Sequence, residues 1–249
     1  MKDRQGKYKL IPILKRLTYP CAESIITISD GVARDLSDII DMDEAWMRTI
    51  YNPAFDLGIR EKCYKPVGHE WLNDDDKTVV IGVGSLKPQK DFSTLLKAIH
   101  QIENDSIHLI ILGKGDLMEN LVQQANELGI YDRISFPGFV DNPYAYMAKA
   151  DVFALSSAWE GFGNVIVEAM ACETPIVCTD CPGGPAEILD NGTYGSLVPV
   201  GDDVAMAKAI QEMLDHPTNP ELLVSRAHDF RIKKIVDQYE DKLLSVAKQ

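Results

Sequence analysis

Six apolar runs alternate with helical patterns from residue 77 onward, and this alternation is the feature that most limits the fold. Each run is short, rich in Val, Ile or Leu, and ends near a Gly, a Pro or a polar residue, which is typical of buried strands. The runs cover residues 78–84, 107–112, 133–137, 151–155, 175–178 and 195–199. This order of strands and helices predicts an α/β fold with a doubly wound parallel sheet of Rossmann type.

Helices are expected between and after these runs. In the first of them, Phe92, Leu95 and Ile99 fall on one face. The expected helices cover about residues 91–102, 121–128, 142–149, 184–189, 203–214 and 221–229. Ligands of such sheets bind at the carboxyl ends of the strands. We therefore expect a site lined by residues 84–85, 113–115, 138–139 and the residues around Glu160.

The N-terminal part has a different pattern. Residues 24–29 predict one strand, and Ser29 or Asp30 begins a helix that runs to about Ile40. Residues 1–50 hold too few elements to bury a core, so we interpret them as the remnant of a second domain. Asn52-Pro53 breaks the chain. We expect a linker over residues 51–76, a ligand-binding domain over 77–229 and a last helix over 230–249.

Charge and composition exclude several classes of function. The 249 residues carry a net charge of −13, which argues against nucleic acid as a general partner. The sequence contains no secretory signal and no run long enough to span a membrane, and its five Cys are irregularly spaced. We expect a cytoplasmic protein. The basic residues within 1–20 are interpreted as a solvated helix face, with peripheral contact to the inner face of the membrane as the alternative.

No metal or cofactor is expected. Cys178 and Cys181 form a single C-x-x-C without further ligands nearby, and we interpret the pair as structural. The five His residues are scattered. Gly82-Val83-Gly84 lacks the third glycine of the dinucleotide motif, which disfavours a nicotinamide site.

The stretch from Glu160 to Ala171 carries the strongest functional signal. Two carboxylates, Glu160 and Glu168, lie eight residues apart and flank a Gly-Phe-Gly turn that opens a short apolar helix. Free backbone N–H groups at such a turn can hold an anion, and carboxylates accept hydrogen bonds from sugar hydroxyls. The structural alternative makes Glu168 a buried acid satisfied by the backbone and Glu160 a surface cap. We favour a functional role, because a buried helix rarely carries an unpaired acid without one.

In this context the chain resembles the retaining GT-B glycosyltransferases of family 4, or glycosyltransferase group 1, over their C-terminal, donor-binding domain. The matching segments are residues 80 and 84–86 with 89–90, 112–115, 136–139, 156–171, 175–177, 183–188 and 195–199. Residues 181–189 look like the branch that builds bacterial surface polysaccharides. The resemblance implies the Rossmann-like half of a GT-B fold.

The resemblance also implies roles for the site residues. Glu160 and the backbone of residues 161–163 would hold the donor sugar, Glu168 the ribose hydroxyls and Lys90 the diphosphate, while residues 138–140 would read the base. Glu160 and Lys90 are the expected catalytic residues. The full expected donor site is Gly84, Ser85, Lys90, Gly138, Phe139, Val140, Glu160, Gly161, Phe162, Gly163, Asn164, Val165 and Glu168. Departure of the leaving group would be metal-free.

Two departures from the family pattern matter. The family usually has Gly-Arg-Leu where this chain has Gly84-Ser85-Leu86, so one of two cations on the diphosphate is missing. Lys87 or Lys114 could compensate, or turnover is slow. Most of the N-terminal acceptor domain is also absent from the match, so the chain as given is expected to bind donor but to transfer poorly.

We therefore expect a retaining hexosyltransferase that moves a sugar from a nucleotide-sugar to a polysaccharide, lipopolysaccharide or lipid-linked acceptor. A UDP-sugar is favoured over GDP-mannose as donor. One alternative is a non-catalytic nucleotide-sugar binding module, or half-enzyme, that works with a separate N-terminal acceptor domain. Others are a GT-B sugar epimerase, disfavoured because paired catalytic His and Asp candidates are lacking, and a protein that only binds partners.

Overall fold

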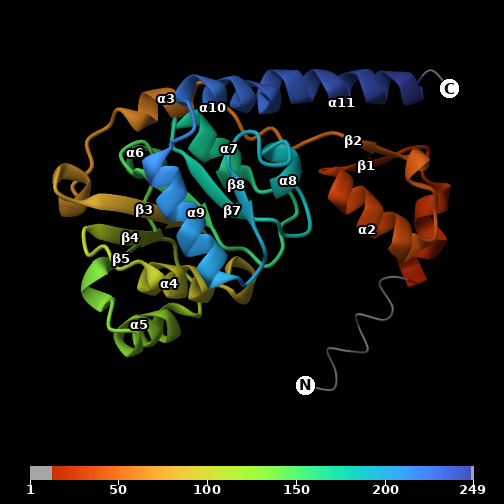
Figure 1. Ribbon diagram of the computed structural model, residues 1–249. Helices are drawn as coiled ribbons and strands as arrows, with labels where there is room; N and C mark the ends of the chain where they lie inside the picture. Colours follow the sequence, from red (N-terminus) through yellow and green to blue (C-terminus); the bar gives the residue numbers. More distant parts are fainter. Residues whose placement is uncertain (1–12, 248–249) are drawn as a thin grey trace.

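The computed structural model describes residues 13–247. Within this range the main body is built on a parallel sheet of six strands in the order β5-β4-β3-β6-β7-β8 (Figure 1). The strands are β3 (Thr78–Val83), β4 (Ile107–Leu112), β5 (Ile134–Gly138), β6 (Val152–Leu155), β7 (Ile176–Thr179) and β8 (Ser196–Val198). The chain starts in the middle, winds outward to β5, returns to β6 and winds outward to β8. The predicted α/β fold with a doubly wound sheet is confirmed.

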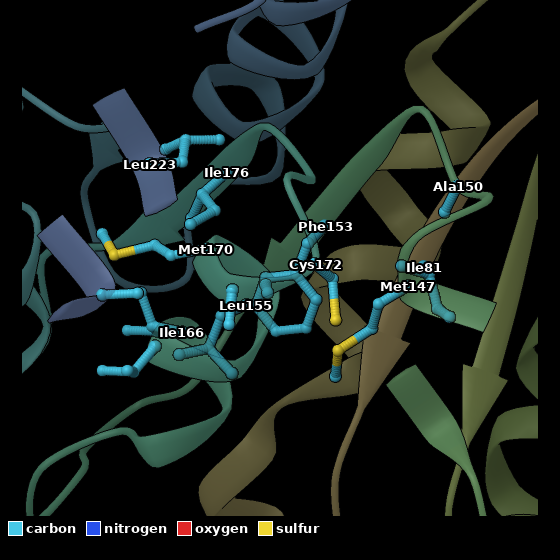
Figure 2. Close-up of a cluster of buried hydrophobic side chains, with 14 of the residues drawn as sticks. Ile81, Met147, Ala150, Phe153, Leu155, Ile166, Met170, Cys172, Ile176 and Leu223 are labelled. Atoms are coloured by element: carbon cyan, nitrogen blue, oxygen red, sulfur yellow. The ribbon is translucent and has the colours of Figure 1, made fainter. Parts of the chain in front are cut away.

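Helices cover both faces of this sheet. They are α3 (Gly58–Cys63), α4 (Phe92–Gln101), α5 (Met118–Glu127), α6 (Pro143–Met147), α7 (Asn164–Ala171), α8 (Pro185–Ile188), α9 (Asp203–Asp215) and α10 (Pro220–Ala227). Alternate strand residues point to opposite faces, which separates two cores. Val80 packs with α4, α5 and α9, whereas Ile81 packs with α6, α7 and α10. Figure 2 shows the second core, in which Phe153 and Leu155 of β6 face Ile166 and Met170 of α7.

The reversal of the winding places a crevice between β3 and β6. These two strands are neighbours in the sheet, with Val80 beside Val152 and Ile81 beside Phe153. Their connections leave in opposite directions, β3 toward β4 and β6 toward β7. In open parallel sheets this switch point, at the carboxyl ends of the strands, is where ligands bind. It is therefore the place to look for the predicted site.

Residues 13–50 form a small unit of their own. Residues 13–18 are helical, and β1 (Ile25–Thr27) pairs with β2 (Met47–Thr49) in a parallel sheet of two strands joined through α2 (Asp30–Ile40). Figure 1 shows this unit beside the main sheet. The expected strand and helix are present, and β2 was not predicted. Most of the basic stretch lies in residues 1–12, outside the described residues, and the domain limits stay a prediction.

The segment expected to be a linker packs on the main body. Residues 51–76 include α3 and a 3-10 turn, Glu70–Asn73, and bury Phe55 and Ile59 in the core of the main sheet. The N–H of Phe55 donates to the oxygen of Phe230 at 3.1 Å, and the N–H of Ile232 donates to the oxygen of Phe55 at 3.1 Å. The segment is thereby tied to the start of α11 (Ile232–Ala247), a long helix that leaves the main body (Figure 1).

Candidate functional site

The loop between β6 and α7 forms the centre of the site. Gly163 has a φ of +101°, a left-handed conformation that turns the chain sharply into α7. Ile166 and Met170 of α7 are fully buried, which fixes the helix against the sheet. Within residues 13–247, none of the backbone N–H groups of residues 161–165 has a hydrogen-bond acceptor. The start of α7 thus offers free donors and the positive end of a helix dipole.

Glu160 and Lys90 form a buried ion pair at the switch point. Lys90 ends a 3-10 turn after β3, and its Nζ lies 2.5 Å from Glu160 Oε1. The two side chains are only 13% and 8% exposed. Ser157 Oγ also donates to Glu160 Oε1 at 2.7 Å, and Gln89 Nε2 donates to Glu160 Oε2 at 3.4 Å. The Glu160 carboxylate is therefore held in one orientation, which does not fit the surface-cap alternative.

Glu168 lies one turn into α7 and lines the same crevice. Its carboxylate makes no hydrogen bond to any of residues 13–247, although the residue is half-buried. Burial raises the pKa of the Glu168 carboxyl, and the nearby Lys90 charge offsets part of that shift. The alternative in which the backbone satisfies Glu168 is not what the structure shows. An acid with open acceptors in a crevice can bind hydroxyl groups.

Two adjoining cavities hold the predicted residues. One, of about 470 Å³, is lined by Ile28, Asn52, Val83, Gly84, Lys90, Glu160, Gly161, Phe162, Gly163, Asn164, Val165 and Glu168. The other, of about 340 Å³, is lined by Val83, Gly84, Ser85, Leu112, Gly113, Lys114, Phe139, Val140 and Pro143. They share Val83 and Gly84. Of the predicted site residues only Gly138 lines neither, and its carbonyl accepts from the N–H of Gly113 at 2.9 Å.

Two glycines are required by close backbone contacts around the site. A Cβ on Gly113 would lie 1.8 Å from the carbonyl oxygen of Gly84, and a Cβ on Gly183 would lie 1.9 Å from that of Glu160. Both have positive φ, +146° and +123°. At these contacts the loops after β4 and β7 pack directly against the loops that contain Gly84 and Glu160. Any side chain at either position would displace them.

Phe162 contributes differently from its neighbours. Its side chain is 2% exposed and packs against the rings of Tyr51 and Phe230, with centroids 5.5 Å away in each case. Burial and the charge of Glu187 raise the pKa of the Tyr51 hydroxyl to about 12, so this cluster stays neutral. The Phe162 side chain therefore anchors the loop, and only its backbone is left to meet a ligand.

Sequence reasoning missed two contributors from the N-terminal side. Asn52, interpreted from the sequence as a chain break and not as a site residue, lines the larger cavity, and its Nδ2 donates to Asn164 Oδ1 at 3.0 Å. Ile28 lines the same cavity from the end of β1. No local pattern marks either residue, because both reach the site across more than a hundred positions of sequence.

Comparison with known proteins identifies the family. Residues 69–230 match the family described as "Glycosyl transferases group 1". The chain belongs to this family. The matched range contains both cavities except for Ile28 and Asn52, so the predicted recognition of a glycosyltransferase of group 1 is confirmed.

Among its relatives is a Campylobacter jejuni N-acetylgalactosamine-N,N'-diacetylbacillosaminyl-diphospho-undecaprenol 4-alpha-N-acetylgalactosaminyltransferase. It is 34% identical over 202 residues, which are 80% of this chain and 53% of the relative. The Rhizobium meliloti lipopolysaccharide core biosynthesis glycosyltransferase LpsE is 33% identical over 68% of this chain and 51% of its own length. The chain thus spans about half the length of the curated relatives it matches.

A solved structure extends the match to the whole fold. Anabaena HepE in complex with UDP and glucose superposes with a TM-score of 0.83 and is 26% identical, covering 97% of this chain and 67% of that one. The main body of this chain therefore has the same fold as the corresponding part of a solved glycosyltransferase.

The described part of the chain has neither a cluster of metal ligands nor a helix that could cross a membrane. His, Cys, Asp and Glu side chains of residues 13–247 form no group of three or more that could hold a metal ion. Over the same residues, every helix is too short or too polar to cross a bilayer.

Proposed function

We propose that this chain is the donor-binding part of a retaining glycosyltransferase that uses a nucleotide-sugar, with a UDP-sugar favoured over a GDP-sugar. One observation carries the proposal: the Lys90–Glu160 pair, the unpaired Glu168 and the free N–H groups of residues 161–165 all line one crevice at the switch point. An enclosed carboxylate beside anion-binding N–H groups suits a ligand that combines hydroxyls with phosphates.

Each group has a role in this proposal. Glu168 accepts hydrogen bonds from the ribose hydroxyls, and Glu160, fixed by Lys90 and Ser157, accepts from hydroxyls of the sugar. The free N–H groups at the start of α7 and the Lys90 ammonium offset the negative charge that grows on the diphosphate as the sugar leaves. The acceptor then attacks the face from which the diphosphate departed, which retains the configuration. No metal takes part in this scheme.

The choice of donor and acceptor draws on the relatives. HepE was solved with UDP and with UDP-glucose, which supports a uridine nucleotide here. The names of the Campylobacter and Rhizobium relatives support a lipid-linked or lipopolysaccharide acceptor. We place the reaction in the cytoplasm, with contact to the inner face of the membrane where a lipid-linked acceptor is used.

The half-enzyme reading remains a second candidate, and one observation favours it. The two-stranded sheet of residues 13–50 leaves a cavity of about 440 Å³ along β1 and α2, lined by Ile25, Ile26 and Leu36 among others. Two strands alone rarely make a stable sheet. In this candidate a separate acceptor domain completes the sheet. The chain then binds donor by itself and transfers sugar only when that domain is added.

Calorimetric titration tests the donor site. UDP and UDP-glucose should bind more tightly than GDP and GDP-mannose. Glu168→Ala should weaken UDP binding by about 10- to 100-fold, as expected when one or two hydrogen bonds to a charged group are lost. Glu160→Ala should reduce the advantage of UDP-glucose over UDP. Absence of binding to all four ligands at millimolar concentration would refute the proposal.

A further inference from the structure

We propose that Lys114 supplies the second positive charge for the donor diphosphate, and that Lys87 does not. This inference rests on the proposed function and assigns a phosphate-binding residue within the same crevice. It concerns the position of Ser85, a neutral side chain where the family resemblance implies a cation.

The charges that line the two cavities show why another cation is needed. They are Lys90, Glu160, Glu168 and Lys114. The ammonium of Lys90 is already engaged at 2.5 Å by Glu160, and Glu168 has no basic partner within 4 Å in the described residues. Without Lys114 these side chains sum to one negative charge. A crevice of that sign repels a diphosphate unless its N–H groups alone outweigh the charge, and the positive end of a helix is worth only about half a unit charge.

Lys114 is the cation in these cavities whose charge is still available. No carboxylate of residues 13–247 lies within salt-bridge distance of its ammonium. Its Nζ instead lies 5.9 Å from the centroid of the Phe139 ring. That ring is 65% exposed, so the contact is a weak cation–π interaction. A phosphate oxygen would be a stronger partner.

The backbone holds Lys114 at the required place. It is the second residue after β4, and its carbonyl accepts from the N–H of Leu86 at 3.0 Å, which fixes it beside Ser85. The contact between Gly113 and Gly84 fixes the residue before it. Lys114 and Ser85 line the same cavity, and that cavity shares Gly84 with the one that holds Lys90. A diphosphate that spans the shared wall would meet one lysine from each side.

Lys87 is close in sequence but unsuited to this role. Like Lys114 it is exposed, but unlike Lys114 it lines neither cavity. It precedes the 3-10 turn Pro88–Lys90. Its charge contributes to the electrostatic potential around the site, but its ammonium makes no short contact with the two cavities. Lys87 is therefore a matched control, with the same charge and a position near the site.

The experiment compares UDP with uridine, which lacks the phosphates. UDP is titrated by calorimetry and uridine by ligand-observed NMR against the wild-type chain, Lys114→Met, Lys114→Arg and Lys87→Met. Lys114→Met should weaken UDP binding by about 10- to 100-fold, the usual effect of losing one charge-assisted contact, and lower the salt dependence of the affinity. Uridine binding should change by less than about twofold. Lys114→Arg should restore most of the UDP affinity, and Lys87→Met should resemble the wild type.

Three results would overturn the inference. Equal losses of UDP affinity in Lys114→Met and Lys87→Met would mean that both lysines act only through the electrostatic potential around the site. Equal losses for UDP and uridine would place Lys114 at the base. A UDP affinity in Lys114→Met equal to that of the wild type would show that Lys114 does not contact the diphosphate. If the wild-type chain binds neither ligand, the proposed donor function falls as well, which distinguishes the two failures.

Discussion

Breaking the Lys90–Glu160 pair should destabilise the chain because it leaves one enclosed charge without its partner, and Lys90→Met tests this. Removing one partner of a buried ion pair costs about 3–5 kcal/mol. Here Ser157 and Gln89 still donate to Glu160, and the crevice admits water, so we expect a loss of about 2–3 kcal/mol. For a chain of this size that corresponds to a fall in Tm of about 4–12 °C.

Thermal unfolding of a double-mutant cycle measures the pair itself. Glu160→Gln alone leaves the Lys90 ammonium enclosed without its partner, whereas the double variant removes both charges. The double variant should therefore lose less free energy of unfolding than the two single variants lose in total, by about 1.5–3 kcal/mol. Lys208→Met is the control, because the Lys208–Glu212 pair is 78% and 62% exposed, and such pairs contribute little. Equal effects of Lys90→Met and Lys208→Met, or an additive cycle, would refute the reasoning.

Three further predictions follow from single contacts. Burial makes the folded chain hold the Glu168 proton more tightly than the unfolded chain does, so the ionised carboxylate destabilises the fold. Glu168→Gln should raise Tm at neutral pH, weaken UDP binding, and leave Tm unchanged in acid, where the carboxyl is protonated in both states. Gly113→Ala should cost about 2–4 kcal/mol by denaturant titration, because its Cβ would lie 1.8 Å from a backbone oxygen. Gly129→Ala, with φ of +69° and open space around it, should cost only about 1–2 kcal/mol. Mild oxidation with peroxide should join Cys63 and Cys172, whose sulfurs lie 3.3 Å apart, and peptide mass spectrometry under non-reducing conditions should detect the link.

The main sheet could be predicted from the sequence because its strands are buried on both faces. Such strands read as continuous apolar runs, and all six were found within one or two residues of the expected bounds. β2 escaped prediction for the opposite reason. Its residues Met47–Thr49 are half-buried or exposed, and it is defined only by pairing with β1. The packing of residues 51–76 was missed because single buried residues such as Phe55 carry no periodic signal.

The candidate site was predictable as a list of residues but not as an arrangement. Local patterns identified Lys90 before a helix and Glu160 before a glycine turn. They could not indicate that the two side chains touch, because 70 positions separate them and the contact depends on β3 and β6 being neighbours. Strand order is a property of the whole sheet. The family resemblance supplied the expected roles, and the structure added the ion pair, the open acceptors of Glu168 and the position of Lys114.

The contact between the start of α2 and the main body gives Glu187 a role that no motif assigned. Its carboxylate accepts from the N–H groups of Asp30 and Gly31 at 2.8 and 2.7 Å, so an acid from α8 caps the start of α2. Ser29 Oγ donates to the carbonyl of Gly161 at 3.1 Å. The first turn of α2 therefore rests on the loop that carries the free N–H groups. A rotation of residues 13–50 against the main body would have to break these bonds, so they couple the N-terminal unit to the loop that carries the free N–H groups.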